Sequence, residues 1–125
     1  MIDTYQNRKQ YKIESDDNKA LEDVARFLDD HFAMNVNQET LEKISKMSGT
    51  KLKNLFKEKY GQGITEYTQR KRMNIAKQLL LNTDLEIRYI AKTVGYTSPS
   101  RFSKLYKRFK GVYPREVKSI VNMAK

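Results

Sequence analysis

Apolar side chains recur at helical spacing along most of this chain. Leu21, Val24, Ala25, Leu28 and Phe32 form one stripe, and the positions between them are largely charged. Apolar residues three to four apart are typical of an amphipathic helix that packs by one face. The same pattern predicts further helices over residues 38–45, 48–60, 64–81, 86–94, 98–110 and 114–122. Since no convincing strand pattern is present, the sequence predicts an all-α fold of about seven helices.

Capping residues and glycines mark where these helices begin and end. Asn18 is suited to cap the first helix and Ser48 the third, because their side chains accept hydrogen bonds from the free N–H groups of a first turn. Gly61 predicts the end of the third helix. Ser98 followed by Pro99 is a helix start of the same kind, with proline at the first helical position.

An internal repeat with an offset of about 50 residues organises the middle and end of the chain. It pairs Leu52, Leu55, Phe56, Lys57 and Gly61 with Phe102, Leu105, Tyr106, Lys107 and Gly111. Upstream the offset is 49 and pairs Leu41 with Ile90. Each copy predicts a short helix, a tight polar turn and a basic helix, which is the order of a helix-turn-helix whose second helix enters the major groove of DNA.

The repeat predicts the organisation of the whole chain. Residues 1–17 are polar and aperiodic and are expected to be a flexible N-terminal arm or the remnant of a linker. Residues 18–63 are the first helix-turn-helix subdomain, 64–82 a linker helix, 83–122 the second subdomain and 123–125 a tail. A linker helix of about 18 residues is about 27 Å long. It suits two reading helices about one DNA turn apart, about 34 Å, so that one monomer reads two successive major-groove segments.

The inward residues of each basic helix leave the intervening positions to face DNA. Arg and Lys suit guanine O6 and N7, Asn suits adenine N6 and N7, and Ser and Thr suit phosphates or base edges. We therefore expect base reading by Thr50, Lys51, Lys53, Asn54, Ser100, Arg101, Ser103 and Lys104. We expect phosphate contacts from Ser48, Lys57, Arg70, Thr97, Ser98, Lys107 and Arg108.

Charge supports a polyanionic partner. The chain carries 25 Lys and Arg against 15 Asp and Glu, a net charge of +10, and no acidic residue lies between Ile87 and Arg115. Such a field attracts phosphate and releases condensed counterions, which predicts double-stranded DNA as the partner. The acidic first-helix face, with Glu22, Asp23, Asp29 and Asp30, is either solvated or contacts RNA polymerase.

The sequence contains few residues suited to catalysis or metal binding. The chain has no cysteine and one histidine, His31, so it offers no thiolate metal site and no acid-base or nucleophilic triad. We expect no enzymatic activity, no metal and no cofactor. No apolar run approaches the length of a membrane span and the start resembles no signal peptide, which predicts a cytoplasmic protein without a membrane partner.

Three segments resemble the DNA-binding domain of the AraC/XylS family of bacterial regulators: MSGTKLKNLFKEKYG, EYTQRKRMNIAKQLLLNTDLEIRYIAKTVGY and SPSRFSKLYKRFKGVYPREV. The resemblance implies seven helices in two lobes that bind DNA, in most members as an activator that contacts RNA polymerase. It places base-reading positions on Thr50, Lys51, Lys53, Asn54, Pro99, Ser100, Ser103 and Lys104.

Some residues depart from the family pattern or are assigned by it to a different role. Proline has no donor side chain, so we interpret Pro99 as a helix start. Lys46 and Gly49 differ from the family pattern, and Gly49 is expected to weaken the start of its helix by up to about 1 kcal/mol. Arg72 matches the family's linker-helix arginine, for which we expect a structural or phosphate-linked ion pair.

Three other functions compete with a specific regulator. A non-specific architectural DNA-binding protein needs wedge side chains for the minor groove, and the two short, capped reading helices argue against it. An adaptor would use its helices to bind a protein such as RNA polymerase, and contact with DNA would be incidental to its function. A membrane-surface role needs an apolar face opposite the lysines, but the helix-turn-helix cores use those faces. The sequence is compatible with a stand-alone member and with a fragment of a longer regulator.

Overall fold

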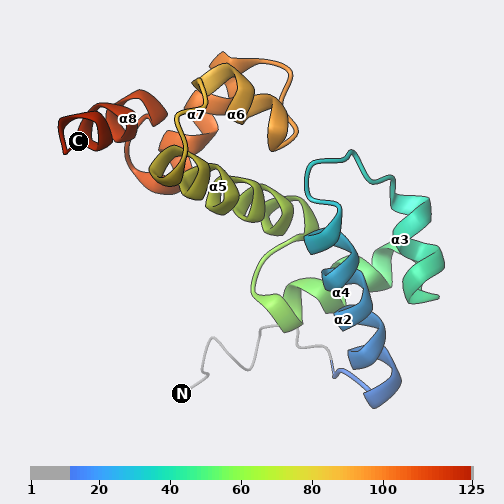
Figure 1. The fold of residues 1–125 in the computed structure, drawn as a ribbon. Helices are drawn as coiled ribbons and strands as arrows, with labels where there is room; N and C mark the ends of the chain where they lie inside the picture. The colour runs from blue at the N-terminus through green and yellow to red at the C-terminus, as the bar shows by residue number, and fades with distance from the viewer. Residues whose placement is uncertain (1–11, 125) are drawn as a thin grey trace, which may run out of the picture. The chain divides into compact units, whose positions relative to one another are not determined.

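A computed structural model describes residues 12–124 of the chain. In this range every regular element is an α-helix, which confirms the predicted all-α class (Figure 1). The helices are α2 (Ser15–Asp30), α3 (Gln38–Ser45), α4 (Gly49–Tyr60), α5 (Ile64–Asn82), α6 (Ile87–Thr93), α7 (Pro99–Lys110) and α8 (Pro114–Met123). From α3 onward the predicted bounds agree with these to within one residue.

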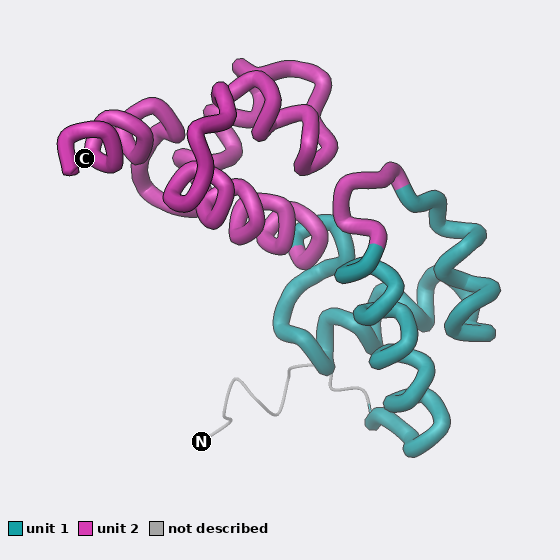
Figure 2. Tube along the Cα trace, in the orientation of Figure 1, with its two compact units in different colours: residues 1–30, 36–66 teal, residues 31–35, 67–125 magenta. Residues whose placement is uncertain are grey.

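The described residues form two compact units (Figure 2). The first unit comprises the residues up to Asp30 together with Val36–Glu66, and the second comprises His31–Asn35 together with Tyr67 onward. By sequence, the first unit carries 11 Lys and Arg against 12 Asp and Glu, a net charge of −1. The second carries 14 against 3, a net charge of +11. The positive charge of the chain is therefore a property of the second unit.

The start of α2 differs from the prediction. The helix begins at Ser15, so Asn18 is not its cap: the Asn18 N–H already donates to the Glu14 carbonyl at 2.8 Å. Asp16 and Asp17 lie in the first turn, where negative charge is favourable beside the free N–H groups. Residues 15–17, which the sequence analysis assigned to the arm, are helical.

The two helices that the sequence analysis expects to read DNA, α4 and α7, begin and end in the same way. The Ser48 hydroxyl accepts the N–H of the third following residue at 3.2 Å, and Ser98 does the same for α7. Each helix ends at a glycine in the left-handed region, Gly61 with φ 72° and Gly111 with φ 83°. The predicted caps and stops are confirmed, and the repeat is thus visible in the backbone as well as in the sequence.

Each unit has its own apolar core. Burial confirms most of the inward positions that the periodicity predicts, although Phe32 and Leu105 are only partly buried. The core of the first unit contains Leu21, Val24, Leu28, Leu41, Leu52, Leu55 and Phe56. That of the second contains Met73, Ala76, Leu80, Ile90, Ala91, Val94, Tyr96, Phe102 and Tyr106. These cores hold α4 and α7 by one side and leave the other side to solvent.

Arg72 on α5 ties the segment His31–Asn35 into the second unit. Its guanidinium donates to the backbone carbonyls of Phe32 at 2.5 Å and Met34 at 3.2 Å. It also lies over the ring of Tyr96, 5.0 Å from the ring centroid, and the residue is only 8% exposed. The role is structural, as expected, but the partners are carbonyl oxygens and a ring rather than the carboxylate or phosphate of an ion pair.

Candidate nucleic-acid interface

The eight residues expected to read bases lie on the solvent side of α4 and α7. The buried side of α4 is formed by Leu52, Leu55 and Phe56, and that of α7 by Phe102 and Tyr106. Six of the eight side chains are exposed, and Asn54 and Ser103 are partly buried. The two helices therefore each present a polar and cationic face, as a groove-reading helix requires.

The residues expected to contact phosphate surround these faces. Ser48 and Ser98 act as helix caps, and each hydroxyl keeps its own hydrogen for a further acceptor. Arg70 is exposed on α5 and lies over the ring of Phe109, 5.3 Å from its centroid. Exposed side chains of α4, α7 and the turn before α7 complete the set: Lys57, Thr97, Lys107 and Arg108.

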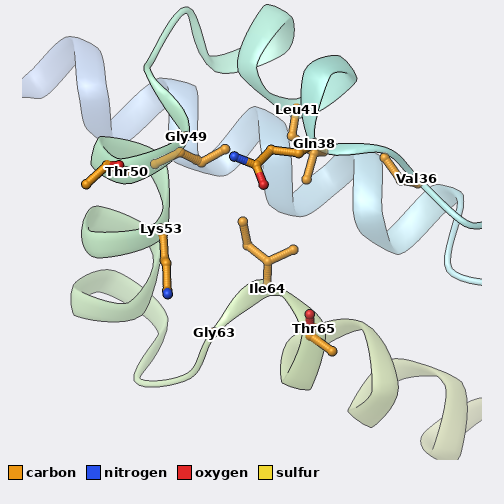
Figure 3. A pocket seen from close by; sticks show the side chains of 10 residues that line it. Val36, Gln38, Leu41, Gly49, Thr50, Lys53, Gly63, Ile64 and Thr65 are labelled. Carbon is orange, nitrogen blue, oxygen red and sulfur yellow. The ribbon is translucent and has the colours of Figure 1, made fainter.

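A hollow of about 550 Å³ adjoins the reading face of the first unit (Figure 3). The starts of α3, α4 and α5 line it, with Thr50 and Lys53 at its edge. A Cβ built at Gly49 would overlap the end of the Gln38 side chain, whose amide points toward Gly49 in Figure 3. Glycine at this departure from the family pattern thus leaves space for Gln38, a neighbour that sequence spacing did not reveal.

Carboxylates of α2 neutralise two lysines of α4. Lys51 Nζ lies 3.2 Å from Asp17 Oδ2. Lys59 Nζ lies 3.3 Å from Glu22 Oε1, and its side chain is 19% exposed. Glu22 therefore stabilises the first unit internally, which gives part of the acidic first-helix face a structural use.

Titration behaviour reflects the different fields of the two units. In the first unit, burial raises the pKa of Tyr60, and the negative charge of nearby α2 carboxylates raises it further. In the second, burial lowers the pKa of Lys110, and the positive charges of Lys77 and Arg70 lower it further. A cation gathered among other cations in this way gains by accepting phosphate as a neighbour.

Two cations of α6, Arg88 and Lys92, were not among the residues that the sequence analysis expected to contact DNA. Arg88 and Lys92 are one turn apart, exposed, and line a hollow of about 370 Å³ together with Thr97 and Pro99. Arg88 also pairs with Glu86 at 3.1 Å. Their spacing of four residues on α6, the first helix of the second helix-turn-helix, could have identified them from the sequence, because side chains so spaced share one face of a helix.

Residues 12–124 contain no cluster of three or more acidic, histidine or cysteine side chains placed to hold a metal ion. No helix in this range has the length and apolar composition needed to cross a bilayer.

Comparison with known proteins is consistent with this geometry. A family profile described as "Helix-turn-helix domain" matches residues 41–119. The HTH-type transcriptional regulator YisR of Bacillus subtilis is 30% identical over 115 residues, which cover 92% of this chain and 40% of YisR. The transcriptional activator RhaS of Escherichia fergusonii is 31% identical over 113 residues, covering 89% of this chain and 41% of RhaS. The chain belongs to the AraC/XylS family of bacterial transcription regulators.

Solved structures share the fold of this AraC/XylS member. The C-terminal domain of the response regulator AraT from Geobacillus stearothermophilus superimposes with a TM-score of 0.74 at 25% identity and covers 88% of each chain. The DNA-binding domain of AdpA, solved with a target DNA, gives a TM-score of 0.77 at 21% identity, covering 85% of this chain and 96% of that domain. The chain spans about 40% of the length of YisR and of RhaS.

Proposed function

We propose that this chain binds specific double-stranded DNA by placing α4 and α7 in two successive major-groove segments, and that it does so as part of a cytoplasmic transcription activator. The observation that carries the proposal is the pair of equivalent helices: both have a serine cap, a glycine stop, a buried apolar side and an exposed polar and cationic side. The membership of the AraC/XylS family and the DNA-bound AdpA domain of the same fold support it.

The chemistry of the exposed sides suits base reading. Arg101 and Lys104 are donors for guanine O6 and N7, and the Asn54 amide matches adenine N6 and N7. Lys57 and Lys107, one turn further along their helices, are exposed and would neutralise phosphates in this proposal. In this proposal the base-reading residues choose the sequence, and the surrounding cations supply affinity that depends on salt.

The connection between the units supports reading by a monomer. Helix α5 has 19 residues and is therefore about 28 Å long. We propose that it sets the two reading helices about one DNA turn apart, about 34 Å, so that one chain contacts two major-groove segments without a second copy. We further propose that the full regulator contacts RNA polymerase; its relative RhaS is named a transcriptional activator, which supports an activating role.

Selection of bound duplexes from a random library, with the purified chain at a salt concentration near physiological, tests the proposal. The expected product is a motif of two boxes separated by about one helical turn, about 10 base pairs. Binding that is sensitive to salt but selects no motif would refute specific reading by this chain and favour the architectural alternative. A motif with a single box would refute reading by both helices.

Substituting Lys104 tests base reading in the second unit. We expect Lys104→Ala to weaken operator binding by about 1 to 3 kcal/mol and to relax the preference at one or two positions of the second box. Lys118→Ala removes the same charge from α8 and is the matched control, for which the selected motif should be unchanged. If Lys104→Ala weakens binding to all sequences equally, Lys104 contacts only phosphate.

A further inference from the structure

The cations of the two helix-turn-helix copies differ in how they are neutralised. On α3, the first helix of the first helix-turn-helix, Lys43 Nζ lies 4.0 Å from Glu39 Oε1. With the offset of 49 residues, Glu39 corresponds to Arg88 in the second copy, so a carboxylate of one copy is replaced by a cation in the other. Within the first unit, Lys43, Lys51 and Lys59 each lie within 4.0 Å of a carboxylate.

Lys51 is the expected base-reading residue that the first unit neutralises directly. Its Nζ lies 3.2 Å from Asp17 Oδ2, with side-chain exposures of 52% for Lys51 and 22% for Asp17. Both residues line a hollow on the reading face that also includes Ser48, Thr50 and Asn54. Asp17 thus lies among the residues that would meet DNA, although it contributes no attraction for it.

The corresponding residue of the second copy has no such partner. With the offset of 50, Lys51 corresponds to Arg101, which is exposed and, within residues 12–124, is paired with no carboxylate. The ion pair is therefore a feature of the first unit and does not follow from the helix-turn-helix design.

We propose that Asp17 is a specificity-determining residue that holds Lys51 in a neutral pair on non-matching DNA and releases it only to a matching base. The inference rests on the proposed function. On a random sequence Lys51 can gain only a phosphate contact, which resembles the surface ion pair that it would give up. On the operator it gains hydrogen bonds to a base edge, which are stronger because their geometry is fixed. Asp17 therefore lowers affinity for random DNA more than affinity for the operator, as a repulsive element against the wrong partner does.

Asp17→Asn keeps the shape of the side chain and removes its charge. Binding is measured by fluorescence anisotropy at several salt concentrations, on the selected operator and on a scrambled duplex of equal length. We expect the scrambled duplex to bind about two- to fivefold more tightly, the range that a surface ion pair permits. The slope of log K against log salt should steepen by about 0.9, the value for one further neutralised phosphate. The operator should gain less, so the ratio of the two affinities falls.

Asp16→Asn is the matched control, because Asp16 carries the same charge in the same turn of α2 and is exposed. It should change both affinities slightly and by the same factor. In a Lys51→Ala background, Asp17→Asn should have no effect beyond that of Asp16→Asn. Circular dichroism of each variant establishes that α2 is intact.

Three results would overturn the inference while leaving the proposed function in place. If Asp17→Asn behaves as Asp16→Asn does, or keeps its effect without Lys51, Asp17 acts only through net charge. If Asp17→Asn weakens operator binding, Asp17 orients Lys51 for the base instead of withholding it. A wild-type chain that does not prefer the operator over the scrambled duplex would refute the proposed function itself, and the inference with it.

Discussion

Replacing Arg72 by alanine should destabilise the second unit without removing any residue that faces DNA. The substitution removes two donors from the carbonyls of Phe32 and Met34, 2.5 and 3.2 Å away, and the cation from the ring of Tyr96. Because the partners lie about 40 residues earlier in the chain, no local helix signal compensates for the loss. The segment His31–Asn35 should then detach from the unit to which it belongs.

The expected loss follows from these contacts. A hydrogen bond to a charged donor contributes about 1.5 to 3 kcal/mol, and a desolvated cation over a ring about 2 kcal/mol, which applies here because Arg72 and Tyr96 are both buried. The bond to the Met34 carbonyl is only partly buried, so water replaces part of its contribution. We therefore expect Arg72→Ala to lower the free energy of unfolding by about 3 to 5 kcal/mol. Arg72→Lys should lose less, because it keeps the charge but lacks the planar fork of donors.

Urea unfolding followed by circular dichroism measures this loss, and limited proteolysis reports on His31–Asn35. Lys77→Ala is the control, since it removes one exposed cation from the same helix and should change stability by no more than about 0.5 kcal/mol. Arg72→Ala should also make residues 31–35 the first site of cleavage. Equal stabilities for Arg72→Ala and Lys77→Ala would refute the structural role assigned to Arg72.

Two further predictions concern backbone fit and the residues that sequence spacing missed. Gly95→Ala should destabilise the second unit by about 1 to 3 kcal/mol, because Gly95 has a φ of +103° and a Cβ there would lie 2.7 Å from the backbone carbonyl oxygen of Ala33. Gly49→Ala should be nearly neutral, because its Cβ would meet only the end of the flexible Gln38 side chain. Thermal melts in which Gly49→Ala is the more destabilising of the two would contradict this prediction. Arg88→Ala with Lys92→Ala should make the slope of log K against log salt shallower by up to about 1.8 without altering the selected motif; an unchanged slope would show that neither residue neutralises a phosphate.

Local signals in the sequence predicted the helices and their ends. Ser48, Ser98, Gly61 and Gly111 were identified correctly because a cap or a stop depends on a few neighbouring residues. The start of α2 was misplaced for the same reason: residues 15–18 are Ser, Asp, Asp and Asn, all of which can cap, so composition alone does not choose among them. The periodicity also predicted which sides of α4 and α7 are buried, and hence which residues are free to face DNA.

Contacts between residues far apart in the chain were decided only by the tertiary structure. The pairing of Asp17 with Lys51, the bonds from Arg72 to Phe32 and Met34, and the arrangement of Arg88 beside the start of α7 follow from how helices pack. Helical periodicity fixes which side of a helix is buried but not which carboxylate or carbonyl lies opposite a given cation, because many packings satisfy the same apolar stripe. The sequence by itself therefore determined the family, the all-α class and the exposed sides of α4 and α7, whereas the fold decided which of the cations are already neutralised.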